Sequence, residues 1–227
     1  MYRLNLKIKR LFDMFSAGIL AVFLLPLWIG VAAAIKKDSK GTVFFRQERR
    51  TENGRIFHML KFRSMVTGAE QMGSGLFNYA GDPRVTRVGR KLRDTSIDEL
   101  PQLFNIIRGD MSLIGPRPCV AYELGDFDTL NKKYKKRFEM KAGLTGYAQI
   151  KGRNGISWDE KVALDNHYID LFKRYGILID IKILIASAGV LFKKENIYEK
   201  KAEEYLDDAA AAELAEEEII RLAHLPD

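Results

Sequence analysis

One segment near the N-terminus constrains the fold more than any other. Residues 14–35 form a run of 22 residues without a formal charge, and a helix of about 20 apolar residues can cross the hydrocarbon core of a bilayer. The run is longer than the core of a signal peptide, which is about 7–15 residues, and no clear small-residue cleavage site ends it. We therefore predict a helix that enters a membrane; a buried helix of a soluble core is the weakest interpretation.

The residues around this run bear on its topology. Pro26 lies within the run and removes a backbone hydrogen bond, which favours a bend. One interpretation is a re-entrant helix that turns near Pro26, and the other is a straight span, since transmembrane helices tolerate proline. Positive charge is retained on the cytoplasmic side of a membrane, so cations on both flanks favour the re-entrant form. They are Lys7, Lys9, Arg10, Lys36, Lys37, Lys40, Arg46, Arg49 and Arg50.

Charge divides the chain into unlike parts. The formal net charge is +7, but residues 1–195 carry 34 basic and 20 acidic residues, and residues 196–227 have a net charge of −7. A body this basic indicates an anionic partner: phosphate groups, nucleic acid or an acidic membrane surface. We predict a re-entrant membrane helix in residues 1–40, a catalytic domain in residues 41–195 and an acidic helical tail in residues 196–227. The single cysteine, Cys119, excludes a disulfide scaffold and a multi-thiolate zinc site.

The predicted fold class is α+β, with a mainly helical cytoplasmic domain behind the membrane helix. Short apolar runs at residues 42–45 and 56–60 flank a polar turn at Asn53-Gly54, which predicts a β-hairpin. Residues 68–81 are rich in glycine and predict a mobile loop.

Apolar periodicity predicts three helices in the second half of the chain, over residues 98–108, 157–174 and 177–192. Pro101 favours a start just before it, which makes Asp98 the predicted N-cap, and Gly109 is placed to end the helix. Asp180 and Lys182, near the start of the last helix, favour an amphipathic interfacial helix over a second span.

Two adjacent carboxylates lie among the cations of residues 82–117. Asp98 and Glu99 are surrounded by seven of them: Arg84, Arg87, Arg90, Lys91, Arg93, Arg108 and Arg117. A carboxylate pair ringed by guanidiniums suits phosphoryl transfer, because arginines neutralise phosphate oxygens while a carboxylate attacks phosphorus or holds a divalent metal. Ordinary capping of a helix start is the alternative, and by pattern alone it is the more frequent one. Lys61 and Arg63 are either exposed or contact phosphate.

In this order along the chain, several motifs resemble one family. They are KRLFD (9–13), Pro26, KFRSM (61–65), DELPQL (98–103), GDMSLIGPRP (109–118), GLTGYAQ (143–149) and GRN (152–154). Over residues 5–195 the chain resembles the bacterial sugar transferases, monotopic phosphoglycosyl transferases that start glycan assembly on polyprenyl phosphate. The resemblance implies the short form of that family. Ala142 stands where the family commonly has proline.

The resemblance implies a reaction and a site. Asp98 would attack the β-phosphate of a UDP-sugar, expel UMP and form a covalent phosphosugar, which polyprenyl (undecaprenyl) phosphate then collects. Glu99 would assist with Mg²⁺, whose implied protein ligands are Asp98 and Glu99. The implied substrate-binding residues are Lys61, Arg63, Arg93, Arg117 and Arg153. The implied location is the cytoplasmic face of the bacterial inner (plasma) membrane, with the lipid bilayer as a further partner.

A rival of another class is a non-enzymatic, basic membrane-bound scaffold or nucleic-acid binder. Its cations would avoid carboxylates and its surface would offer stacking aromatics, whereas here the arginines cluster around Asp98 and Glu99. We therefore expect no nucleic-acid partner. The sequence leaves open a homo-oligomer, the sugar that is transferred, the glycan pathway and the role of the tail.

Overall fold

The computed structural model describes residues 2–72, 75, 81–152 and 155–193. The predicted acidic tail, residues 196–227, and half of the predicted mobile loop, residues 68–81, lie outside the described residues. The described part is mixed helix and sheet, mostly helical with two small sheets. The α+β class is confirmed at that level.

Two helices form the N-terminal part and meet at an angle. Helix α1 (Tyr2–Phe23) and helix α2 (Leu25–Asp38) differ in direction by 62°. Pro26 lies in the first turn of α2, where a missing N–H costs no helical hydrogen bond. Among the described residues no single helix is both long and apolar enough to cross a bilayer, whereas this bent pair meets the requirement jointly. We call α1 and α2 the bent pair.

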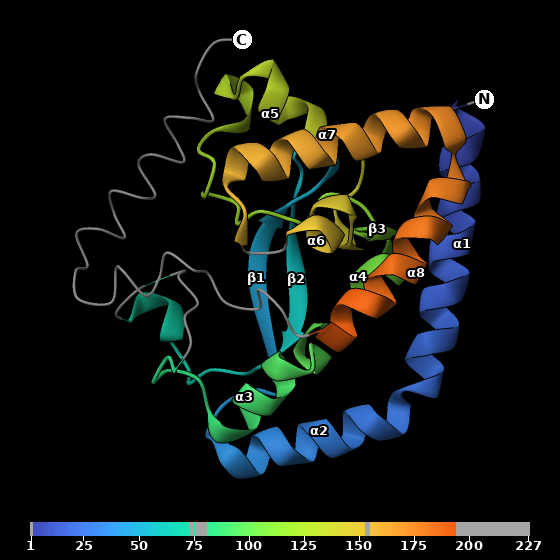
Figure 1. The fold of residues 1–227 in the computed structure, drawn as a ribbon. Coiled ribbons are helices and arrows are strands. Elements are labelled where there is room, and N and C mark those ends of the chain that lie inside the picture. The colour runs from blue at the N-terminus through green and yellow to red at the C-terminus, as the bar shows by residue number, and fades with distance from the viewer. Residues whose placement is uncertain (1, 73–74, 76–80, 153–154, 194–227) are drawn as a thin grey trace.

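A β-hairpin occupies the middle of the molecule (Figure 1). Strand β1 (Phe44–Arg50) pairs antiparallel with β2 (Ile56–Phe62), with Phe44 opposite Phe62 and Arg50 opposite Ile56. Asn53 in the connection has a φ of 56°, the left-handed conformation that asparagine adopts more readily than most residues. The predicted hairpin is confirmed, although β1 begins and ends later than expected.

A second sheet was not predicted. Strand β3 (Ser112–Ile114) pairs parallel with β4 (Gly143–Thr145). A side chain at Gly143 would place its Cβ 2.1 Å from the Gly115 nitrogen, so this crossing requires glycine. The neighbouring Ala142 N–H donates to Thr51 Oγ1 at 3.1 Å, a bond that proline would lack.

The remaining helices surround the hairpin. They are α3 (Arg87–Asp94), α4 (Gln102–Arg108), α5 (Lys132–Lys136), α6 (Tyr147–Lys151), α7 (Trp158–Tyr175) and α8 (Ile177–Lys193). Short 3₁₀ turns cover Glu52–Gly54, Ala69–Gln71, Ile97–Glu99, Phe127–Thr129 and Arg137–Glu139. Figure 1 shows α1 along one side, α2 along the bottom and α7 across the top. The hairpin is therefore framed by helices on three sides.

Helix boundaries confirm two predictions and correct a third. Ser157 and Glu160 form a capping box at the start of α7, and Gly109, with a φ of 95°, ends α4. Asp98 is not the N-cap of α4: it lies in the turn Ile97–Glu99, and Pro101 precedes the helix. The predicted helix start lies one turn too early, because a 3₁₀ turn is inserted ahead of the α-helix.

Buried charges join α1 to the rest of the molecule. Lys9 Nζ donates to the Ile114 carbonyl at 2.8 Å and pairs with Asp180 Oδ2 at 2.5 Å. Tyr168 donates its hydroxyl to the other Asp180 oxygen at 2.8 Å. Asp180 therefore points inward and does not lie on the exposed face of α8. The exposed large side chains of α8 are instead apolar: Leu178, Ile181, Leu184 and Ile185.

Two further residues of α1 bind backbone groups of the domain. Arg10 donates to the carbonyls of Ile106 and Ile107 at 2.5 and 2.7 Å, at the C-terminal end of α4. Asp13 accepts from Ser112 Oγ at 2.7 Å and from the Leu113 N–H at 3.1 Å. We call Lys9, Arg10 and Asp13 the α1 clamp. Lys9 and Arg10, two of the cations that flank the uncharged run, therefore bind groups of the protein itself.

Candidate active site

A pocket of about 480 Å³ opens beside the hairpin. Its walls come from β1, β2, the segment after β2, α3, the turn before α4, the chain after β3, and α7. Five residues predicted from the sequence to form the site line it: Lys61, Arg63, Arg93, Asp98 and Arg117. The fold therefore brings together segments that are more than 50 residues apart in the sequence.

Asp98 lies on the turn that precedes α4. The preceding residue but one, Ser96, has a φ of 56°, and the turn leaves Asp98 only 7% exposed. Burial raises the pKa of Asp98 to about 6, against the opposing charge of Lys61. Within the described part of the chain the Asp98 carboxylate makes no hydrogen bond. Its oxygens are thus available to a ligand in the pocket.

Glu99 is held differently from its neighbour. Its Oε1 accepts from Lys61 Nζ at 3.1 Å and from Arg117 Nη2 at 2.7 Å. Burial raises the pKa of Glu99, but the charges and hydrogen bonds of Arg117 and Lys61 outweigh burial and lower it below its ordinary value. Glu99 is therefore ionised while it orients two cations beside Asp98. Environments that displace the pKa values of two carboxyls in opposite directions are typical of sites that assign them different roles.

The backbone of Arg117 is fixed by a buried ion pair whose two residues also line the pocket. Arg137 donates to the Arg117 carbonyl at 2.7 Å and pairs with Asp165 Oδ2 at 2.9 Å. The side chains of Arg137 and Asp165 are each 2% exposed, and Arg137 also lies over the Trp158 ring at 5.0 Å. Neither Arg137 nor Asp165 is among the site residues predicted from the sequence. They come from separate segments, and no spacing links them.

The other predicted cations differ in how they are held. Arg93 donates from Nε to Ser64 Oγ at 3.1 Å at the pocket wall. Arg63 donates to the carbonyls of Thr42 and Lys40 at 2.6 and 2.9 Å. The Arg63 guanidinium thus ties the chain between α2 and β1 to the end of β2. Arg63 therefore stabilises this connection in addition to lining the pocket.

The other cations of the sequence cluster are held by neighbouring groups or lie away from the pocket. Arg84 pairs with Asp82 at 2.7 Å and donates to the Met72 carbonyl at 2.8 Å, which braces the segment that precedes it. Arg153 lies outside the described residues. A further cation, Arg49, was not predicted for the site; it lines the pocket and donates to the Pro118 carbonyl at 3.0 Å. The cluster residues that do not line the pocket are Arg87, Arg90, Lys91 and Arg108.

The donor set suits a divalent cation that is shared with a substrate. Mg²⁺ is commonly held by one or two carboxylates together with substrate phosphates and water. Asp98 offers a carboxylate without a hydrogen bond from any described residue, and Glu99 offers a second one beside it. In the described ranges no group of three or more His, Cys, Asp or Glu side chains could hold a metal. The described side chains alone therefore do not form a complete metal site around these carboxylates.

A pocket carboxylate with a second carboxylate beside it and several fixed cations is typical of enzymes that act on phosphate groups. Residues 4–194 match the family model described as "Bacterial sugar transferase". The chain belongs to this family, whose members are membrane-associated bacterial enzymes.

Its relatives differ in length. The chain is 43% identical over 184 residues to "Undecaprenyl-phosphate glucose phosphotransferase" of Komagataeibacter xylinus, which covers 78% of the chain and 34% of the relative. It is 35% identical over 205 residues to "Undecaprenyl-phosphate galactose phosphotransferase" of Salmonella typhimurium, and the match covers 84% of the chain and 42% of that relative. It is 37% identical over 190 residues to "Uncharacterized sugar transferase EpsL" of Bacillus subtilis, and the match covers 84% of the chain and 90% of that relative. The chain thus spans well under half of the first two relatives.

Proposed function

We propose that this protein transfers a sugar 1-phosphate from a UDP-sugar to polyprenyl phosphate and releases UMP, as the first membrane step in assembling a glycan. The observation that carries the proposal is the Asp98 carboxylate, buried in the pocket beside Lys61, Arg93 and Arg117. Membership of the sugar transferase family supports it. So do the names of two relatives, which give undecaprenyl phosphate with glucose or galactose.

The proposed reaction has two displacements at one phosphorus. An oxygen of the Asp98 carboxylate attacks the β-phosphorus, which carries the sugar, and the bond from this phosphorus to the bridging oxygen breaks. UMP leaves with that oxygen, and the phosphosugar stays on Asp98. An oxygen of polyprenyl phosphate then attacks the same phosphorus, the bond to Asp98 breaks, and the free carboxylate returns. This sequence is nucleophilic catalysis with a covalent intermediate.

The surrounding cations stabilise the charge that moves during these steps. Lys61 and Arg117 are fixed by Glu99, so their donors point to one place before the substrate arrives, which is the condition for effective electrostatic stabilisation. Arg93 at the pocket wall, and Arg153 by the family resemblance, are proposed further phosphate contacts. Mg²⁺ held by Asp98 and Glu99 would neutralise charge on the phosphates of the donor.

The bent pair supplies the proposed attachment to the bilayer. Many of its large side chains are exposed and apolar: Leu4, Ile8, Leu11, Met14, Phe15, Ile19, Leu20, Val22, Phe23, Leu25, Leu27 and Ile29. Since α1 and α2 turn by 62° between them, a re-entrant path brings both outer ends back to one face. We place that face on the cytoplasmic side of the bacterial plasma membrane, where the acceptor phosphate of a bilayer-embedded lipid reaches the pocket.

The variant Asp98→Asn tests the nucleophile. We expect it to lower UMP release by at least about 10³-fold, because an amide cannot form the covalent intermediate. The assay uses the full chain in nanodiscs with Mg²⁺, polyprenyl phosphate and a panel of UDP-sugars. The matched control is Asp128→Asn, because Asp128 is exposed and lies outside the pocket lining.

Two outcomes of this assay contradict the proposal. Turnover at the wild-type rate in Asp98→Asn would remove Asp98 from its role. UMP release that proceeds equally without polyprenyl phosphate would identify a sugar-nucleotide hydrolase instead. A wild-type protein that binds polyanions in a salt-dependent way and releases no UMP from any UDP-sugar would favour the scaffold alternative.

A further inference from the structure

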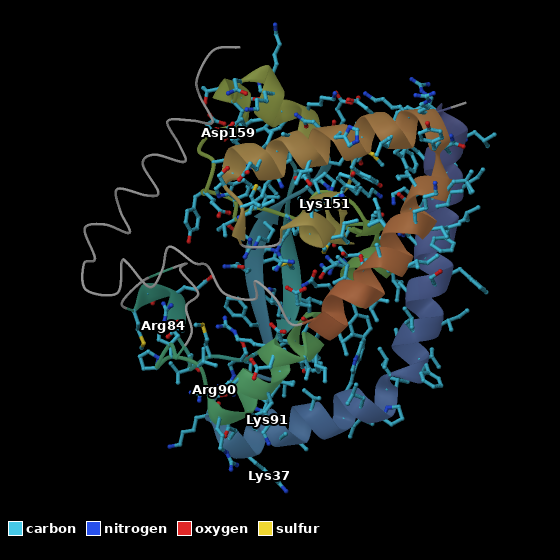
Figure 2. The ribbon with its side chains drawn as sticks, viewed as in Figure 1. Lys37, Arg84, Arg90, Lys91, Lys151 and Asp159 are labelled. Atoms are coloured by element: carbon cyan, nitrogen blue, oxygen red, sulfur yellow. The ribbon has the colours of Figure 1, made fainter. Side chains whose placement is uncertain are left out.

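A group of exposed cations lies where the bent pair joins the domain. We call it the α2–α3 cationic surface. Its members are Lys37, Lys40, Arg87, Arg90 and Lys91, all exposed. Figure 2 shows Lys37, Arg90 and Lys91 together at the end of the molecule formed by α2 and α3. None of these five lines the pocket.

The acidic groups nearby leave most of this charge uncompensated. Asp38 accepts from the Val88 N–H at 2.9 Å at the start of α3, and this bond lowers the pKa of Asp38. The same carboxylate lies 3.7 Å from Arg87. Asp94, at the other end of α3, is half-buried. Within the described ranges Lys37, Arg90 and Lys91 make no ion pair or side-chain hydrogen bond.

The surface continues the apolar face of the bent pair. Along α2, exposed Leu25, Leu27 and Ile29 are followed about two to three turns later by the lysines at its C-terminal end. Helix α3 packs beside that end and carries Arg90 and Lys91. A helix that leaves the hydrocarbon region places its terminal lysines at the level of the lipid headgroups. Cations of a neighbouring helix then reach the same layer.

From this continuity and this charge we infer that the α2–α3 cationic surface binds the headgroups of anionic phospholipids in the bilayer. The inference rests on the membrane attachment in the proposed function. Five cations spread over α2, the segment after it and α3 match a layer of many anionic headgroups better than one acceptor phosphate. Helix α3 separates the two tasks, because Arg93 of the same helix lies at the pocket wall. The surface thus holds α3 against the membrane while its other face serves the pocket.

The test is lipid selectivity in the reconstituted full-length protein. Spin-labelled phosphatidylglycerol and phosphatidylcholine are compared in nanodiscs, and the ratio of immobilised lipids is measured by electron paramagnetic resonance. Each basic residue near an anionic surface is worth about fivefold in binding. The triple variant Lys37→Gln/Arg90→Gln/Lys91→Gln should therefore lower the preference for phosphatidylglycerol by at least about threefold. High salt should lower it in the wild type as well.

The matched control removes the same charge from the far end of the molecule. It is Lys133→Gln/Lys135→Gln/Lys136→Gln on α5 (Figure 1), and its lipid preference should equal that of the wild type. A triple α2–α3 variant that keeps the wild-type preference overturns the inference. So does displacement of the labelled phosphatidylglycerol by stoichiometric polyprenyl phosphate, which would make the acceptor the occupant.

A second measurement separates this inference from the proposed function. UMP release is assayed in the same nanodiscs. Preference for phosphatidylglycerol without UMP release in the wild type contradicts the proposed reaction and leaves the surface in place. UMP release without any such preference contradicts the surface and leaves the reaction. A wild type that immobilises neither lipid contradicts membrane attachment itself.

Discussion

At the scale of single residues, Lys61 connects the two carboxyls of the site. It binds Glu99 at 3.1 Å, and its charge opposes the effect of burial on the pKa of Asp98. Because Asp98 must be ionised to attack phosphorus, proposed UMP release should fall at acidic pH as this carboxylate is protonated. Removal of the ammonium removes a charge that stabilises the ionised form, so the pKa should rise.

We therefore expect Lys61→Met to move the acid limb of kcat/KM for UMP release to higher pH than in the wild type. The measurement compares both proteins at the same Mg²⁺ concentration between pH 5 and 8. Lys133→Met, which breaks an exposed ion pair with Asp159 on α7, is the control and should leave the limb in place. An acid limb that stays or moves to lower pH would exclude this role of Lys61.

The buried pair of Arg137 and Asp165 makes a second prediction at this scale. Removal of one partner leaves the other charge buried and unpaired, which costs about 3–5 kcal/mol, whereas replacing both by apolar residues is often neutral. We expect Asp165→Leu to lower the free energy of unfolding by that amount, and Arg137→Met/Asp165→Leu to recover much of it. Denaturant titration in detergent measures both.

Kinetic measurements distinguish a role of this pair in stability from a role in positioning Arg117. The double variant should still show raised KM for the UDP-sugar or lowered kcat, because the bond from Arg137 to the Arg117 carbonyl is gone. Arg137→Lys should restore part of the activity, since a lysine can still donate to that carbonyl. A stable double variant with wild-type kinetics would show that the pair has no influence on Arg117.

At the scale of elements, the α1 clamp joins a helix with a large exposed apolar surface to the domain. Asp180→Asn leaves the Lys9 ammonium buried at 4% exposure without its carboxylate. We expect a loss of about 3–5 kcal/mol in the free energy of unfolding. Asp170→Asn on α7 is the control, because its ion pair with Lys136 is exposed and worth at most about 1 kcal/mol. Equal losses in the two variants would contradict the clamp.

The elements also show how far the sequence could predict the fold. The hairpin and α7 follow from local signals, namely the turn at Asn53-Gly54 and the capping box of Ser157 and Glu160. The pairing of β3 with β4 has no such signal, because three-residue strands 28 or more residues apart show no alternation. The inward direction of Asp180 depends on Lys9, 171 positions away, which helix periodicity alone cannot show.

The sequence likewise predicted part of the candidate site, namely the residues that lie in local motifs. Motifs near Asp98 in the sequence located the carboxyls, Arg93 and Arg117, and their chemistry explains why these residue types stand together. The distinct surroundings of Asp98 and Glu99 depend on Lys61, which comes from β2. Arg137 and Asp165 act through the Arg117 backbone. Such support is a property of tertiary structure and leaves no pattern in the chain.

At the scale of the whole molecule, the proposed re-entrant path predicts that both outer ends of the bent pair face the cytoplasm. We expect cysteines introduced as Tyr2→Cys and Lys40→Cys to react with an impermeant maleimide only when the cytoplasmic face is accessible, as in inverted vesicles. The native Cys119 provides a low background, because it is 2% exposed and burial raises the pKa of its thiol to about 11. Labelling of the Tyr2 position only from the outside would establish a straight span.

The α1 clamp has a consequence for engineering this protein. Lys9, Arg10 and Asp13 satisfy backbone or charged groups of β3, α4 and α8, and α1 also contributes Ala17 and Ala21 to the main hydrophobic core. A chimera that exchanges α1 for a generic membrane anchor would keep the tether and lose these partners. A truncated domain produced without α1 would expose the same surface to water. The helix is therefore part of the folding unit, and a soluble version would need redesign of the surface that α1 covers.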